Sequence, residues 1–137
     1  MIEIPFYIPR TRYIEKIRPF SGSRIIKVLT GQRRTGKSYL FYQLMDEIRK
    51  QDEKANILYI NTEFAEWRQI ARAEDLYGYV RAKQVRGKHN YLFIDEIQEI
   101  ERFEEAVKSL FAESRWDIYI TGSNARLLSG ELATYLA

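Results

Sequence analysis

Short apolar runs alternate along the chain with longer stretches in which apolar residues recur every three or four positions. The short runs are almost entirely apolar, which predicts strands buried on both faces. The longer stretches predict amphipathic helices that cover those strands. The pattern places strands at about 25–30, 57–60, 91–94 and 118–120, and helices at about 36–50, 74–86, 101–114 and from 127 onward. This alternation indicates a three-layer α/β domain with a parallel sheet.

Each of the first three of these helices carries one apolar face, and these faces supply the candidate core. The residues on them are Leu40, Phe41, Leu44, Met45 and Ile48 in the first helix, Leu76, Tyr79 and Val80 with Lys83 alongside in the second, and Phe103, Val107, Leu110 and Phe111 in the third. No internal repeat or low-complexity segment interrupts the pattern.

A glycine-rich segment joins the first expected strand to the first expected helix. It consists of Gly31, Gln32, Arg33, Arg34, Thr35, Gly36, Lys37 and Ser38, a complete G-x-x-x-x-G-K-[ST] phosphate-binding loop. The glycines let backbone N–H groups approach phosphates closely, and the helix that follows points its positive end at the same anion. Lys37 is expected to reach the β- and γ-phosphates, and Ser38 to offer its hydroxyl to Mg²⁺. The predicted nucleotide-binding segment extends from Gly31 through Tyr39. An ordinary glycine turn is the alternative, and the flanking strand and helix argue against it.

Two carboxylates, Asp95 and Glu96, directly follow the third apolar run, about 60 residues after the phosphate-binding loop. A buried strand next to the strand of that loop would deliver both acids at its carboxyl end, where open α/β sheets bind ligands. Asp95 is expected to hold Mg²⁺, and Glu96 to orient and deprotonate an attacking water. Such a pair alone is often only a loop start or a helix cap, so the prediction depends on its combination with the loop.

The fourth apolar run ends in small polar residues, Thr121, Gly122, Ser123 and Asn124. A turn with an N-cap from Ser123 or Asn124 explains them as well as a functional role does, and the two can coexist. Together with the loop and the acidic pair, this segment resembles the additional-strand, catalytic-glutamate branch of P-loop ATPases. In that branch Asn124 would match the sensor-1 asparagine, which contacts the attacking water or the γ-phosphate.

Three segments resemble one family more closely: Gly-Gln-Arg-Arg-Thr-Gly-Lys-Ser at 31–38, Phe-Ile-Asp-Glu-Ile-Gln at 93–98 and Ile-Thr-Gly-Ser-Asn-Ala-Arg-Leu-Leu-Ser at 120–129. They are similar to an AAA+-like ATPase family of bacteria and archaea whose members often continue into a C-terminal domain of unknown function. The resemblance covers about 13–136 and implies a P-loop NTPase fold with sheet order 5-1-4-3-2. Only four strands are visible, so the fifth strand and the helical lid are expected beyond Ala137. Relatives commonly carry an arginine finger just before the fifth strand, and this sequence offers no clear candidate for it.

Length and composition limit the number of domains, the compartment and the chemistry that can be expected. The 137 residues suit one domain, 1–137, expected to be a truncated N-terminal P-loop ATPase domain. Apolar residues make up 45% and charged residues 30%, with no cysteine, no secretory signal and no apolar stretch long enough to cross a bilayer, so a cytoplasmic protein is expected. Without cysteine, the sequence excludes disulfides and thiolate chemistry.

The net charge of +3 is unevenly distributed. Residues 1–38 hold nine lysines and arginines against two glutamates, which favours a polyanionic nucleotide. A second basic stretch at 81–89 leaves nucleic acid open as a partner, but no stacking aromatics lie within it, and a solvated loop explains it better.

The sequence therefore predicts an enzyme that binds Mg-ATP and hydrolyses it to drive a conformational change in a longer protein. One alternative is a nucleotide-gated switch or partner-recruiting module with negligible hydrolysis, and another is a small-molecule phosphotransferase. A homo-oligomer or a protein partner is expected, with no membrane partner. Because the arginine finger and lid are expected elsewhere, the 137-residue chain alone should turn over ATP only weakly.

Overall fold

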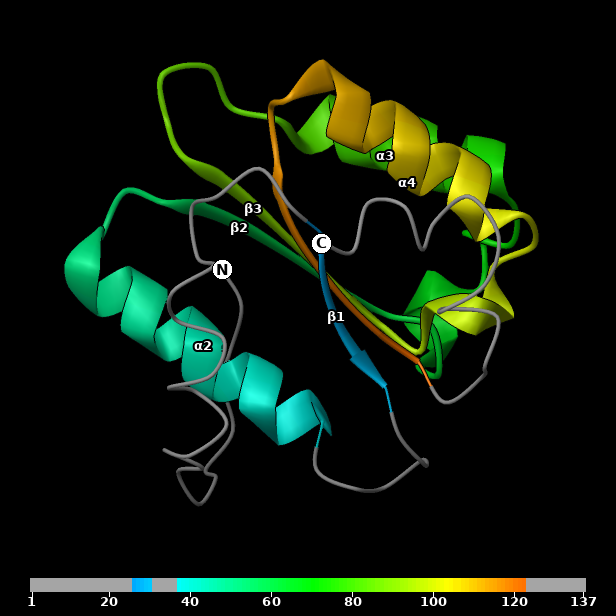
Figure 1. The fold of residues 1–137 in the computed structure, drawn as a ribbon, viewed down its shortest axis with the longest axis horizontal. Coiled ribbons are helices and arrows are strands. Elements are labelled where there is room, and N and C mark those ends of the chain that lie inside the picture. Colours follow the sequence, from blue (N-terminus) through cyan, green and yellow to red (C-terminus); the bar gives the residue numbers. More distant parts are fainter. Residues whose placement is uncertain (1–25, 31–36, 123–137) are drawn as a thin grey trace.

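The computed structural model describes residues 26–30 and 37–122. Strands and helices alternate along this part of the chain, as the apolar pattern predicts (Figure 1). The elements are β1 (Lys27–Thr30), α2 (Lys37–Gln51), β2 (Asn56–Asn61), η2 (Ala65–Trp67), α3 (Ala73–Lys83), β3 (Asn90–Asp95), η3 (Ile97–Glu99), α4 (Phe103–Glu113) and β4 (Asp117–Gly122). Among the described helices, none combines the length and the apolar character needed to cross a membrane. The helix expected from 127 onward lies outside the described residues.

The four described strands form one parallel sheet in the order β1-β4-β3-β2. This order confirms the 1-4-3-2 part of the arrangement that the family resemblance implies. It also shows that one expectation is wrong, because β3 does not lie next to β1. The last of the described strands, β4, inserts between them and pairs with both. Parallel strands are joined by helical crossovers, so proximity in sequence does not decide which strands pair.

Helices cover both faces of the sheet, with α2 on one face and α3 and α4 on the other (Figure 1). Successive side chains of a strand point to opposite faces. In β3, Phe93 packs in the cluster beneath α2, whereas Leu92 and Ile94 pack in the cluster beneath α3 and α4. Both faces of β3 are therefore dry, which is why its sequence is almost continuously apolar.

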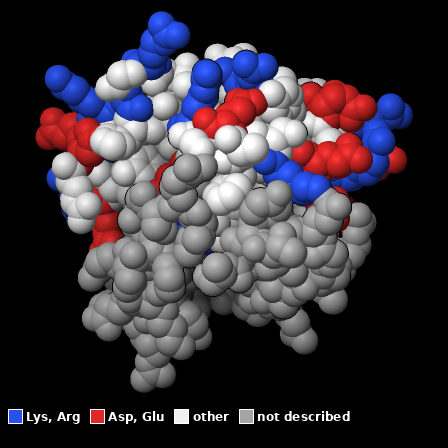
Figure 2. Space-filling model, turned by 45° about the horizontal axis from the view of Figure 1, so that its top comes forward, with Lys and Arg blue, Asp and Glu red and all other residues white. Residues whose placement is uncertain are grey.

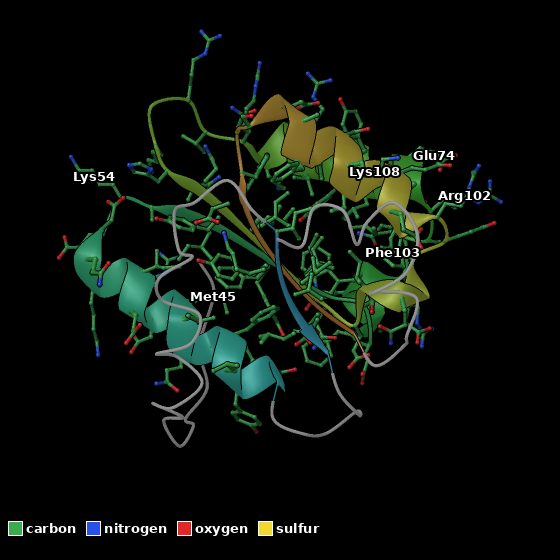
Figure 3. The ribbon with its side chains drawn as sticks, in the orientation of Figure 1. Met45, Lys54, Glu74, Arg102, Phe103 and Lys108 are labelled. Carbon is green, nitrogen blue, oxygen red and sulfur yellow. The ribbon has the colours of Figure 1, made fainter. Side chains whose placement is uncertain are left out.

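Aromatic rings dominate the core between α2 and the sheet. Phe93 and Tyr119 lie on the neighbouring strands β3 and β4, and their rings stack with centroids 4.4 Å apart and planes 8° apart. Phe41 of α2 meets the Phe93 ring edge-on at 5.0 Å. Met45, labelled in Figure 3, is fully buried in the same cluster one turn further along α2. These contacts fix the distance between α2 and the sheet.

On the other face, α3 and α4 pack side by side over the sheet (Figure 1). Phe103, the first residue of α4, is fully buried. Its neighbour Arg102 pairs across to Glu74 of α3 at 3.5 Å, and both side chains are visible at this end of the helices in Figure 3. Acidic and basic side chains are interspersed over the described surface in Figure 2. Exposed pairs of this kind contribute only about 0–1 kcal/mol each, so the apolar layer beneath them does most to hold the helices.

Helix α3 ends at Lys83, three residues before the sequence pattern predicts. The side chain of Asn90 accounts for the difference. Its Oδ1 accepts a hydrogen bond from the Val85 N–H at 3.0 Å, and its Nδ2 donates to the carbonyls of Val85 and Lys88 at 3.1 and 3.0 Å. The Asn90 side chain thus supplies hydrogen-bond partners to the backbone of the loop, and these bonds compete with a further turn of helix.

The aromatic core gives a first prediction. Phe93→Ala should lower the free energy of unfolding by about 3–5 kcal/mol, because it removes a fully buried ring and two ring contacts. Phe64→Ala is the matched control, since Phe64 is 47% exposed and its loss should change stability little. Urea denaturation monitored by circular dichroism measures both. Equal stabilities for the two variants would contradict the packing described here.

Candidate functional site

Polar side chains from several elements meet at the carboxyl edge of the sheet. Asp95 is the last residue of β3 and lies directly opposite Asn61, the last residue of β2. It follows Phe93 by two positions, so its side chain lies on the α2 face. Ser38, the second residue of α2, reaches it from that side. This edge is where open α/β sheets bind ligands.

The Asp95 carboxylate is 1% exposed and accepts hydrogen bonds from three hydroxyls. Ser38 Oγ and the Tyr59 hydroxyl both donate to Oδ2, the latter at 2.9 Å, while Thr121 Oγ1 donates to Oδ1. Burying a carboxylate is unfavourable unless hydrogen bonds replace its water, and these three donors do so. The donors come from α2, β2 and β4, so three elements determine where the carboxylate lies.

Thr121 connects the two acidic residues through one hydroxyl. Its Oγ1 donates to Asp95 Oδ1 and accepts the Glu96 N–H at 3.0 Å. The side chain is fully buried in β4, beside β3 in the sheet. Thr121 therefore uses both the donor and the acceptor capacity of its hydroxyl to hold the end of β3.

Glu96 has a left-handed backbone conformation, with φ 57° and ψ 51°. For a residue other than glycine such a conformation costs on the order of 1–3 kcal/mol, and it persists where surrounding contacts fix it. Here Thr121 accepts the Glu96 N–H, and the Thr62 hydroxyl donates to the Glu96 carbonyl at 2.6 Å. Residues at the ends of β2 and β4 thus hold the carbonyl and the amide of Glu96.

The Glu96 side chain is also buried, with the residue 5% exposed. Gln98 in η3 donates a hydrogen bond from Nε2 to Glu96 Oε2. Glu96 directly follows Asp95, so the structure places the second acid at the same edge of the sheet as the first.

Tyr59 is half-buried on β2, with its ring 5.6 Å from that of Tyr42 on α2. Burial first, and then the negative charge of Asp95, raise the pKa of the Tyr59 hydroxyl above its usual value. The phenol therefore stays protonated at neutral pH and can donate to Asp95. Asn61 Nδ2 donates to the same hydroxyl oxygen at 3.3 Å.

Among the site residues predicted from sequence, the structure brings Ser38, Asp95 and Glu96 together. Lys37 is the first residue of α2, and Tyr39 is 46% exposed with its ring against Tyr42. The remaining predicted residues lie outside the described part of the chain: Gly31, Gln32, Arg33, Arg34, Thr35, Gly36 and Asn124.

Sequence reasoning missed Tyr59 and Thr62 at this site, and it named Thr121 only as one of the small polar residues that end the fourth apolar run. Each lies at or near the end of a strand that the apolar pattern predicts, so their place at the carboxyl edge was available from the sequence. The apolar pattern could not show their hydrogen-bond partners. The partners depend on β4 lying beside β3 and on the register between β2 and β3.

The residues present fit a magnesium ion. Mg²⁺ prefers hard oxygen ligands, and it commonly binds one or two protein oxygens together with substrate phosphates. Ser38 donates its proton to Asp95, which leaves the lone pairs of Ser38 Oγ for a cation. The Asp95 carboxylate supplies negative charge directly behind this hydroxyl.

A family model described as "AAA domain" matches residues 23–137, which is most of the chain. The chain belongs to this AAA domain family. It is thus a member of the AAA+-like P-loop ATPases, as its motifs suggest.

Two relatives and two solved structures extend this finding. An uncharacterized protein of Haemophilus influenzae is 40% identical over 132 residues, covering 95% of this chain and 33% of its own length. An uncharacterized protein of Methanocaldococcus jannaschii is 38% identical over 111 residues, covering 81% of this chain and 24% of its own length. The chain therefore spans about a third or a quarter of these relatives.

The solved structures are Cdc6p from Pyrobaculum aerophilum, with a TM-score of 0.62 and 14% identity, and PCH-2 from Caenorhabditis elegans, with 0.56 and 15%. The first similarity covers 98% of this chain and 46% of Cdc6p, and the second covers 91% and 39% of PCH-2. At such identities they show the fold alone. Family and fold together support an ATPase-like, nucleotide-binding function for the AAA domain described here.

The double role of the Thr121 hydroxyl gives a prediction for stability. Thr121→Val keeps the shape but leaves Asp95 Oδ1 and the Glu96 N–H without this partner, so the free energy of unfolding should fall by about 1–3 kcal/mol. Thr121→Ser keeps the hydroxyl and should lose clearly less. Urea denaturation compares the two, and a Thr121→Val protein as stable as wild type would show that these hydrogen bonds contribute nothing.

Proposed function

We propose that this AAA domain binds Mg-ATP at the carboxyl edge of its sheet and hydrolyses it. The observation that carries the proposal is the pair formed by Ser38 and Asp95, with Glu96 beside it. A hydroxyl at the start of a helix, directed by a buried carboxylate, is suited to hold a nucleotide-bound cation. Membership of the AAA domain family supports the same function.

The roles of the individual residues follow from their chemistry. Backbone N–H groups of the glycine-rich loop and the Lys37 ammonium would bind the phosphates, and Ser38 and Asp95 would hold Mg²⁺. The bound cation neutralises phosphate charge. Asn124 would contact the attacking water or the γ-phosphate, as the family resemblance implies.

Glu96 would act as the general base. Its carboxylate accepts a proton from water while the water oxygen forms a bond to the γ-phosphorus, and the bond to the bridging oxygen of ADP breaks. Burial and the fixed backbone support this role, because a base must be held within hydrogen-bond reach of the water.

Hydrolysis would drive a conformational change in a longer protein, with a second copy of the chain or another protein as partner. The relatives extend well beyond the matched part, which supports placing the coupled work there. A nucleotide-gated switch is the second candidate, and the hydrogen bond from Gln98 to Glu96 favours it, since that bond occupies an oxygen of the base. Single-turnover hydrolysis in the full protein distinguishes the two, because a switch would bind ATP without converting it.

Lys37→Ala tests the phosphate-binding part of the proposal. The substitution removes the charge proposed to bind the β- and γ-phosphates but leaves the loop backbone, so Mg-ATP affinity should fall clearly while stability barely changes. Isothermal titration calorimetry measures the affinity and thermal unfolding the stability. Wild-type affinity in a folded Lys37→Ala protein would refute the assignment of the loop.

Glu96→Gln tests hydrolysis separately from binding. The amide keeps the size of the side chain but cannot accept the proton, so hydrolysis should fall by roughly 10²–10⁴-fold while ATP still binds. Asp95→Ala should instead weaken Mg²⁺-dependent binding. Steady-state ATPase rates and calorimetry of the full protein measure both effects, and equal turnover by Glu96→Gln and wild type would favour the switch.

A further inference from the structure

We propose that Tyr59 is a positioning residue that sets the magnesium dependence of nucleotide binding by fixing the Asp95 carboxylate. This inference rests on the proposed function, since it concerns the same site. Tyr59 belongs to none of the three motifs that relate the chain to its family. The proposal depends on the hydrogen bonds that converge on one oxygen of Asp95.

That oxygen is Oδ2, and it accepts hydrogen bonds from both Ser38 and Tyr59. The Ser38 hydroxyl is proposed to hold Mg²⁺ together with Asp95, and its proton must point away from the cation for a lone pair to face it. Asp95 Oδ2 is the acceptor for this proton. Any displacement of Oδ2 therefore changes the direction of the Ser38 hydroxyl.

Tyr59 and Thr121 together determine how the carboxylate is rotated. The terminal torsion of an aspartate is broad, so the side chain alone does not select one orientation. Tyr59 on β2 donates to Oδ2 at 2.9 Å, and Thr121 on β4 donates to Oδ1. One donor on each strand beside β3 thus fixes each oxygen of the carboxylate.

Tyr59 is itself well placed to act as a rigid donor. Its ring lies between the sheet and α2, with the Tyr42 ring 5.6 Å away at 59°. Asn61 Nδ2 donates to the Tyr59 oxygen at 3.3 Å, so the phenol accepts from one side and gives its proton to Asp95 on the other. A tyrosine has few side-chain torsions to fix, so holding it in this position costs little entropy.

Removing the Tyr59 hydroxyl should therefore affect the metal and not the phosphates. The proposed contacts with the phosphates come from the glycine-rich loop and Lys37, which the substitution does not change. The contact with Mg²⁺ depends on the orientation of Ser38, which loses one of its determinants. Partners of metal ligands commonly change metal affinity by 10–100-fold when they are removed.

The test compares Tyr59→Phe with wild type by calorimetric titration of ATP, at a series of Mg²⁺ concentrations and in EDTA. We expect the Mg²⁺ concentration that gives half of the metal-dependent gain in affinity to rise about 10-fold, with the affinity in EDTA unchanged. Tyr91→Phe is the matched control, because Tyr91 is a half-buried tyrosine packed against the same α2-face cluster, four residues before Asp95. It should leave the magnesium dependence unchanged.

A double-mutant cycle separates positioning from a general effect on the fold. In an Asp95→Asn background, Tyr59→Phe should produce little further change, because the oxygen through which Tyr59 acts is already altered. A full additional 10-fold shift in that background would overturn the proposal.

Failure of this inference is distinguishable from failure of the proposed function. A wild-type protein whose ATP binding did not respond to Mg²⁺ would contradict the proposed function itself. A wild-type protein that responds, together with a Tyr59→Phe protein that has the same half-saturating Mg²⁺ concentration, would overturn only the role of Tyr59.

Discussion

Burial of the Asp95 carboxylate is the constraint on which the site depends. A carboxylate removed from water loses several kcal/mol of solvation unless donors replace it, and at this position three hydroxyls do. Each hydroxyl comes from a different element, so the position of α2, the order of the strands and their register must all be correct together. The requirements of one buried group thus link the fold to the chemistry.

The same strands build the core and the site. Phe93 and Tyr119 stack beneath α2, and the row of side chains that contains Phe93 ends in Asp95 two residues later. Helix α2 packs on these rings through Phe41, and its second residue is Ser38 at the site. Packing in the middle of the sheet therefore sets the distance between the Ser38 hydroxyl and the carboxylate at its edge.

Backbone strain lies at the residue proposed as the base. Glu96 adopts a left-handed conformation, which Thr62 and Thr121 hold through its carbonyl and its amide. Strain of this kind has to be balanced by surrounding contacts and is concentrated at functional sites, where it fixes a side chain before the ligand arrives. Here it turns the chain sharply between β3 and η3 and keeps Glu96 at the sheet edge.

Local patterns in the sequence determined the α/β class, the bounds of most elements to within a few residues, and the candidate residues Ser38, Asp95 and Glu96. Apolar period and motif spacing act over short stretches of chain, so they can be recognised without the fold. The end of α3 was missed because it depends on a side chain seven residues further on, Asn90.

The apolar pattern did not decide which strands are neighbours, an order that only the family resemblance implied, and the tertiary structure alone decided which hydroxyls meet at Asp95. The insertion of β4 between β1 and β3 places Thr121 beside the acids, and the register of β2 brings Tyr59 within reach. The apolar sequence of a strand indicates that its side chains are buried, but it does not indicate which strand lies beside it. The order of strands in a sheet arises from crossovers and from packing among distant segments.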